Sequence, residues 1–281
     1  MKANTKAIKC LYIFFILWFF HVACFANRKT IIVTGASGEL GGAAARLLAS
    51  DYDLILTGRN FNKLKQLQEE LKSANSGHYE VCTLDFVDNA SKENFNDYLK
   101  QTDALIAGVV LITPRPHFEG KTVIPDEKIW LEVFQSTFTG PMEVLKVMLP
   151  YLSNPSKIVV IAGTTSIQLQ PEWGPFCVIR RMWTTYTKAL SHQLGPQGIS
   201  VNALSPGVVL THFHEERIQK KANENGLSFD DQMEAEVAKI PLRRHAKPKE
   251  VAQTIKFLLS EQSDFINGIN LVLDGGFTLS Y

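Results

Sequence analysis

Compact apolar runs rich in β-branched residues recur along the chain from Thr30 onward, and the stretches between them carry apolar residues at helical spacing. Such runs are typical of strands buried on both faces, and the stretches between them of amphipathic helices. They predict strands at 30–36, 53–58, 79–85, 103–111, 157–163, 200–204 and 270–276, with helices such as 39–50 and 61–74 between them. The alternation indicates an α/β fold with a parallel sheet covered on both faces by helices.

The first 26 residues differ from the rest of the chain. Three lysines and no acid stand within the first ten positions, 11–20 is wholly apolar, and Ala26 offers a small residue for cleavage, with Cys24 two positions before it. This pattern predicts a signal peptide, or an N-terminal membrane anchor if it stays uncleaved, although a spanning helix needs about 20 apolar residues. We therefore expect an exported protein (periplasmic, secreted or lumenal) or a membrane-anchored one. The alternative is a mis-called start codon ahead of a cytoplasmic protein.

The remainder, 27–281, shows no internal repeat and no low-complexity linker, so it is predicted to form a single domain. The whole chain has a formal net charge of +1, and without its first 26 residues it carries −2. Neither value gives the basic excess that nucleic-acid binding through phosphate contacts requires, so that class is excluded. Cys82 and Cys177 are the two cysteines left, which excludes a disulfide scaffold. A single bridge requires the fold to bring them together.

A glycine-rich segment directly follows the first predicted strand and opens the first predicted helix. Its key residues are Gly35, Ser37, Gly38, Leu40 and Gly41. The glycines permit a tight turn and let the backbone approach a pyrophosphate, and the helix N-terminus supplies free N–H groups and a positive dipole. In this context the motif predicts dinucleotide binding on a Rossmann-type doubly wound sheet. The alternative is a purely structural turn.

Further motifs occur in order at 34–37, 84–86, 201–207, 240–243 and 274–276, together with Thr211. With them the chain resembles the short-chain dehydrogenase/reductase family from Thr30 to its C-terminus. The resemblance implies NAD(P)-dependent oxidoreductase chemistry on a small-molecule substrate, and a homodimer or homotetramer. It also implies that the glycine loop is joined in the cofactor site by Asp85, Phe86, Gly108, Arg180, Pro206, Gly207, Val209 and Thr211.

Two details of the cofactor segments matter. Gly38 stands one position before the family's usual second glycine, and Glu39 places an acid beside the expected pyrophosphate, which is tolerable only if its side chain points away. The second strand ends at Arg59 without the acid that would bind ribose hydroxyls and repel a 2′-phosphate. Arg59 can instead pair with that phosphate, so NADP(H) is preferred over NAD(H). The alternative is an arginine that only solvates a loop.

The family's four proton-transfer positions are all substituted. By register with the neighbouring motifs, the Tyr position holds Phe176, the Lys position Arg180, the Ser position Gly163 and the Asn position Thr137. Phenylalanine has no titratable group and glycine has no hydroxyl, so the standard mechanism is not supported. None of the seven tyrosines has a lysine four positions later, so no shift of register restores the pair.

Two interpretations follow. In the first, the chain binds a dinucleotide or another ligand without the family's proton-transfer groups, as a non-standard or silent member. In the second, it is an active NADP(H)-dependent carbonyl reductase or alcohol dehydrogenase with a relocated acid, for which the candidates are Thr164, Thr165, Ser166, Glu172, Tyr186, His212 and His214. The two histidines are expected in a mobile loop without a third ligand, so no metal site is predicted. Segments 113–118 and 212–239 are expected to line or cover the pocket, and 220–239 to form a helical excursion over the surface.

Overall fold

The computed structural model describes residues 28–115, 124–170 and 173–279. The predicted signal peptide or anchor at 1–26 lies outside these ranges, as do His117, Phe118 and Glu172. Within them, no helix combines the length and the apolar character needed to cross a membrane.

Seven strands form one parallel sheet in the order β3-β2-β1-β4-β5-β6-β7. The chain leaves β1 toward β2 and β3 on one side and returns to β4 on the other, so the carboxyl ends of β1 and β4 flank the point where ligands bind in such sheets. The predicted doubly wound α/β fold is confirmed. The strands are β1 (Thr30–Val33), β2 (Asp53–Gly58), β3 (Tyr79–Thr83), β4 (Ile106–Leu111), β5 (Leu152–Ile161), β6 (Ile199–Pro206) and β7 (Asn270–Leu273).

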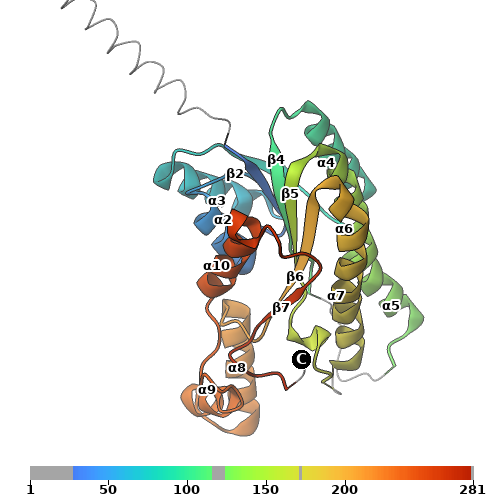
Figure 1. The fold of residues 1–281 in the computed structure, drawn as a ribbon. Coiled ribbons are helices and arrows are strands. Elements are labelled where there is room, and N and C mark those ends of the chain that lie inside the picture. The colour runs from blue at the N-terminus through green and yellow to red at the C-terminus, as the bar shows by residue number, and fades with distance from the viewer. Residues whose placement is uncertain (1–27, 116–123, 171–172, 280–281) are drawn as a thin grey trace, which may run out of the picture.

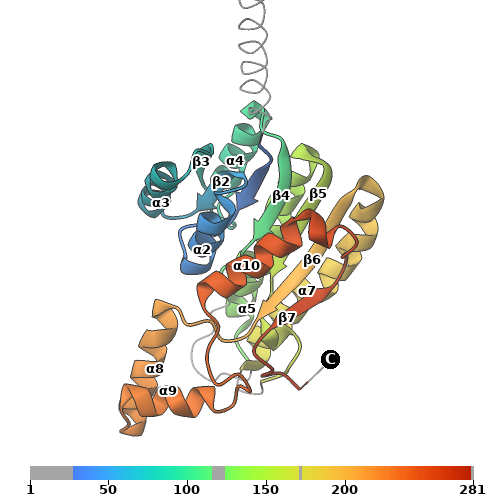
Figure 2. The ribbon, with the colours of Figure 1, turned by 60° about the vertical axis from the view of Figure 1, so that its left-hand side comes forward.

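Helices cover both faces of this sheet (Figures 1 and 2). One face carries α2 (Glu39–Leu48), α3 (Phe61–Ala74) and α10 (Pro248–Leu259), and the other α4 (Asn89–Gln101), α6 (Gly140–Met148) and α7 (Gly174–Leu194). Alternate residues of a strand enter opposite layers, as Ile31 and Val33 do on one side and Ile32 on the other. This two-sided burial explains why the strands are apolar throughout.

A helical pair follows β6 and projects beyond its carboxyl end (Figure 1). It consists of α8 (His212–Asn225) and α9 (Phe229–Val237), which we call the lid. The predicted excursion at 220–239 is therefore helical, but its helix begins earlier than expected. A further short helix, α5 (Glu127–Phe134), leads through a π-helical turn (Gln135–Thr139) into α6.

The two cysteines of the domain do not meet. Cys82 is half-buried at the end of β3, Cys177 is buried on α7, and both are free thiols.

Candidate functional site

The glycine loop connects β1 to α2 at the carboxyl edge of the sheet. Gly38 is the N-cap of α2, and a Cβ at Gly41 would lie 2.3 Å from the carbonyl oxygen of Gly35. Only glycine fits there, because the helix packs directly on the loop. Gly35, Gly38, Leu40 and Gly41 line one groove, which we call the cofactor groove, together with Ile112 and Thr211.

A polar hollow adjoins this groove beyond the end of β2. Ser37, Gly38 and Arg59 line it with Lys63, and Arg59 is exposed. The described lining of the hollow contains two cations and no acid. It therefore favours an anionic group at the place where the second strand ends.

The segment after β3 is fixed by a hydrogen bond of its own and by close packing against α6. The Asp85 carboxylate accepts a hydrogen bond from the Val87 backbone N–H at 3.1 Å, and Phe86 is buried. A Cβ at Gly140 would lie 2.3 Å from the Phe86 carbonyl oxygen, so α6 begins directly against this segment. Neither Asp85 nor Phe86 lines the groove or the hollow.

Gly108 is not where the resemblance implied. It lies inside β4, paired with Ile31 and Lys157 of the two neighbouring strands, and it is buried. Ile112 and Thr113, just after the strand, line the site instead. Val109, Val110 and Leu111 continue β4 past Gly108, in agreement with the strand expected at 103–111.

A cavity of about 350 Å³ adjoins the cofactor groove, and we call it the central cavity. Gly163, Phe176 and Arg180, three of the positions that the sequence register singled out, line it together. The loop after β6 closes its other side with Pro206, Gly207, Val209 and Thr211. Gly163, Phe176 and Arg180 therefore border the same space as the loop after β6.

At positions 163, 176 and 180, this cavity has no side chain that titrates near neutral pH. Gly163 adopts φ +94°, a conformation that L side chains rarely adopt. The Arg180 guanidinium lies 5.2 Å from the Phe176 ring centre and donates to the Ile161 carbonyl at 3.2 Å. Burial, with a smaller contribution from Arg115, lowers the pKa of Arg180 to about 10, so it remains a cation at neutral pH.

The fourth position is sealed away from the cavity. Thr137 is 1% exposed within the π-helical turn, and its hydroxyl donates to the Val133 carbonyl at 2.5 Å. Its own carbonyl accepts the indole N–H of Trp183 at 2.8 Å. Trp183 is fully buried against Phe138. The hydroxyl and the carbonyl of Thr137 are therefore both engaged inside the protein, away from the central cavity.

The candidates for a relocated acid differ in whether their side chains line the central cavity. Thr164 and Thr165 line the central cavity, but the Ser166 hydroxyl lies 3.1 Å from that of Ser205. Tyr186 lines a different cavity on the far side of α7. The His212 side chain is 77% exposed and its Nε2 lies 3.2 Å from Glu216.

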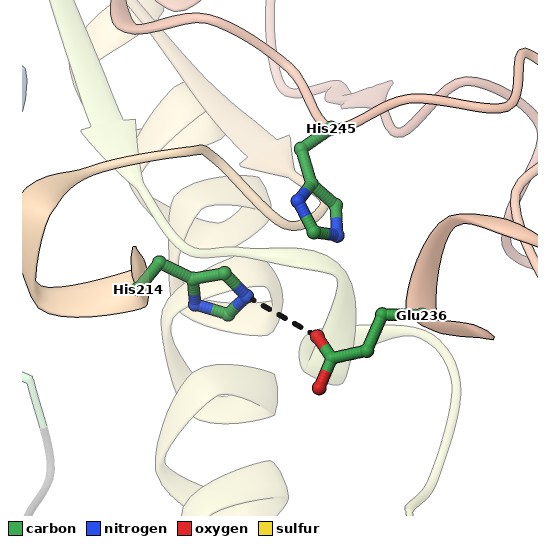
Figure 3. A group of neighbouring side chains, drawn as sticks. All are labelled: His214, Glu236 and His245. Carbon is green, nitrogen blue, oxygen red and sulfur yellow. Dashed lines mark ion pairs between the residues drawn. The ribbon is translucent and has the colours of Figure 1, made fainter. Parts of the chain in front are cut away.

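His214 is placed differently from the sequence-based expectation. Both His212 and His214 lie in the first turn of α8 rather than in a loop, and His214 is 7% exposed and lines the central cavity. The expected absence of a third ligand-type residue is also wrong, because Glu236 of α9 and His245, which precedes α10, meet it (Figure 3). The local helical turn buries one histidine and exposes the other, which their spacing alone does not reveal.

The cluster of His214, Glu236 and His245 joins the lid to the main body. Their ligand-type atoms all lie within 4.8 Å of one another, and His214 Nε2 is 3.7 Å from Glu236 Oε2. His214 and Lys221 lower the pKa of Glu236 to about 2, and Arg217 adds a weaker effect. Burial lowers the pKa of His245. Lys221 already pairs with the single carboxylate, which disfavours adding a metal cation.

Four residues of the site were not singled out by the sequence-based analysis. Trp173 and Phe213 give the central cavity aromatic walls, and Arg115 and Arg217 give it positive charge. Arg115 and the lid residues fall in the two segments expected to cover the pocket, so that expectation is matched where the chain is described.

Over residues 35–278 the chain matches the family model described as Enoyl-(Acyl carrier protein) reductase. It is also 30% identical over 252 residues to a 3-oxoacyl-(acyl-carrier-protein) reductase of Rickettsia felis, a match that covers 88% of this chain and 96% of that protein. The chain belongs to the short-chain dehydrogenase/reductase family. As a member, it is of oxidoreductase type and has the family's NAD(P)-binding fold.

Other short-chain dehydrogenases/reductases resemble it over nearly their whole length. A glucose 1-dehydrogenase of Gluconobacter oxydans is 26% identical over 265 residues, covering 91% of this chain and 93% of that protein. The L-sorbose reductase of Gluconobacter frateurii, solved with NADPH and L-sorbose, superposes with a TM-score of 0.82 at 19% identity, covering 90% and 97% of the two chains. A Pseudomonas aeruginosa oxidoreductase described as containing an atypical catalytic center gives 0.81 at 21% identity, covering 91% and 99%. These structures show the shared fold.

Proposed function

We propose that this protein binds NADP(H) and lacks the family's proton-transfer machinery, so that it is a non-standard or silent member. One observation carries the proposal: Phe176 and Gly163 stand together in the cavity next to the cofactor groove, where the family has a tyrosine and a serine. Phenylalanine neither gives nor takes a proton, and glycine cannot polarise a carbonyl through a side chain.

The chain's own residues fit a dinucleotide. The close packing of Gly41 on Gly35 leaves the backbone of the loop accessible, and the N-terminus of α2 faces the groove. The hollow with Arg59 and Lys63 suits a 2′-phosphate, which supports NADP(H) over NAD(H). When bound, the cofactor would supply hydride chemistry; Arg180 would reach its ribose hydroxyls, and Thr211 would close the groove opposite the loop.

A second candidate function rests on His214. It lines the central cavity and is backed by the Glu236 carboxylate, an arrangement that orients an imidazole for proton transfer. In this version the protein is an active NADP(H)-dependent carbonyl reductase or alcohol dehydrogenase, with His214 as its relocated acid.

Assembly and location are further parts of the proposal. Val178 on α7 and Leu131 on α5 are 52% and 60% exposed, which supports a homodimer or homotetramer formed through these two helices.

The pattern of 1–26 supports export or anchoring of the domain to a membrane. A small molecule, not a nucleic acid, is the expected ligand.

The deciding experiment is a fluorescence titration of the purified protein with NADPH and NADH, followed by turnover assays on a broad carbonyl panel. We expect NADPH to bind more tightly than NADH and no turnover above background. Turnover that is abolished by Gly41→Asp, which blocks the loop, would overturn the silent interpretation. If His214→Gln also abolishes that turnover while NADPH binding persists, the relocated-acid candidate is supported.

A further inference from the structure

Three arginines from separate segments meet at the central cavity. Arg115 follows β4, Arg180 lies on α7, and Arg217 lies on α8 of the lid, and all three line the cavity. Chain elements far apart in sequence have therefore placed three guanidinium groups on the lining of one cavity.

Aromatic rings hold these guanidinium groups in place. Arg115 lies 4.7 Å from the ring centre of Phe213 and 5.5 Å from that of Phe176. Arg180 stacks on the same Phe176 ring, and Arg217 lies 5.8 Å from the ring centre of Trp173. Rings fix the orientation of an arginine and contribute about 0.5–2 kcal/mol each, but they do not neutralise its charge.

The carboxylates that the structure describes leave the three arginines without an ionic partner. Among the residues that the structure describes, no Asp or Glu lines the central cavity, and none of the three arginines forms an ion pair. The nearby acids are engaged elsewhere: Glu236 by Lys221 and His214, and Glu39 and Glu216 by His212. The Nε atoms of Arg180 and Arg217 are buried without a hydrogen-bond partner.

Three unpaired guanidinium groups around one cavity destabilise the protein unless an anion binds there. Burial lowers the pKa of Arg115, and the like charge of Arg217 lowers it further. Buried charges in proteins are normally paired, because an unpaired one loses its hydration without compensation. An anion with two or three oxygen atoms would satisfy the orphaned N–H groups and the repulsion together, since the planar guanidinium fork matches carboxylates and phosphates.

The geometry points to an anion-binding subsite in the central cavity, where Arg115, Arg180 and Arg217 bind the carboxylate or phosphate group of an organic ligand whose apolar part packs on Trp173, Phe176 and Phe213. The inference rests on the proposed function only in placing the cofactor in the groove next to this subsite. The charge and the orphaned N–H groups belong to this chain alone. It names the class of ligand that the substituted site accepts: a small organic acid or a phosphate ester rather than a neutral carbonyl compound.

The test is calorimetric titration of the full chain, with and without saturating NADPH, at constant ionic strength. The probes are succinate and benzoate as carboxylates, and inorganic phosphate and phenyl phosphate as phosphates, each against chloride. We expect at least one probe to bind the NADPH-loaded protein. Arg115→Gln and Arg217→Gln should each weaken that binding about tenfold to a hundredfold, and Arg217→Lys should weaken it less than Arg217→Gln. Arg46→Gln is the matched control, because Arg46 is an arginine already paired with Glu70.

The outcomes separate the two proposals. Binding no stronger than that of chloride, or equal binding by the two glutamine variants and the parent, overturns the anion subsite. Competition between the probe and NADPH also overturns it, because the arginines would then serve the phosphates of the cofactor. NADPH binding without anion binding supports the proposed function and overturns the anion subsite. Anion binding without NADPH binding supports the anion subsite and overturns the proposed function. The relative affinities of succinate, benzoate and the two phosphates decide between a carboxylate and a phosphate ester.

Discussion

The Glu39 carboxylate accepts the backbone N–H of His212 at distances of 2.9 and 3.2 Å, which joins the start of α2 to the start of α8 across the cofactor groove. The acid that follows the glycine loop thus lines the groove and reaches toward the lid. It occupies the first free N–H of α8, a group that would otherwise be available to an anionic part of the cofactor.

Replacing Glu39 by glutamine should tighten NADPH binding. The change removes a negative charge beside the expected pyrophosphate, worth about 1 kcal/mol or roughly fivefold in affinity. Titration of NADPH fluorescence measures it, with Glu69→Gln on the exposed face of α3 as the control. Weaker binding by Glu39→Gln would mean that the link to His212 shapes the groove for the cofactor.

Arg59→Gln should distinguish the two nicotinamide cofactors. Loss of a charge-assisted contact to a 2′-phosphate should weaken NADPH binding about tenfold and leave NADH binding unchanged. Parallel titrations with both cofactors measure this difference. Lys72→Gln, which removes an exposed cation of α3, serves as control. Equal effects on both cofactors would show that Arg59 does not read the phosphate.

Restoring the family residues should succeed only in part. Gly163→Ser at φ +94° is expected to lower the free energy of unfolding by about 1–2 kcal/mol, because a Cβ is strained in this region. Urea denaturation measures the loss. Gly174→Ser is a suitable control, because nothing lies within 4 Å of its added Cβ and its φ lies outside that region. Unchanged stability of Gly163→Ser would show that the loop after β5 readjusts freely.

Acid should loosen the lid through Glu236. Its pKa is lowered from 4.5 to about 2 by His214 and Lys221, so its contribution to stability is complete above about pH 4.5 and is lost as the pH falls toward 2. We expect Glu236→Gln to show a smaller drop in Tm than the parent protein between about pH 6 and pH 3. Glu234→Gln, an exposed acid of α9, should behave like the parent.

Val178→Glu should shift the protein toward the monomer. A charge in the middle of an apolar contact loses its hydration on association. Light scattering after size-exclusion chromatography reports the mass, and Val87→Glu, at an exposed apolar site after β3, is the control. A parent protein that is already monomeric would contradict the proposed oligomer.

The sequence predicted the layers well because their signals are local. β2 and α3 lie at the predicted 53–58 and 61–74, since the strand is continuously apolar and the side chain of Asn60 caps the helix at Lys63. Within the site, the sequence predicted only the residues that belong to the family's motifs or are fixed by register with them. The meeting of Arg115 with Arg217 depends on how the lid packs, and the burial of His214 depends on Glu236 and His245 arriving from other segments. Such distant contacts leave no periodic pattern in the sequence.

The backbone at Gly163 also affects how such a site changes over time. A serine at position 163, two residues after β5, would be strained at φ +94° unless the peptide turned. Phe176 and Arg180 lie one turn apart on α7 with the guanidinium 5.2 Å from the ring centre, so replacing either one alone would break that contact. Single substitutions at these positions therefore cost stability before they bring any catalytic benefit. Selection would then favour changes elsewhere in the cavity, which improve the binding of the ligand that it accepts.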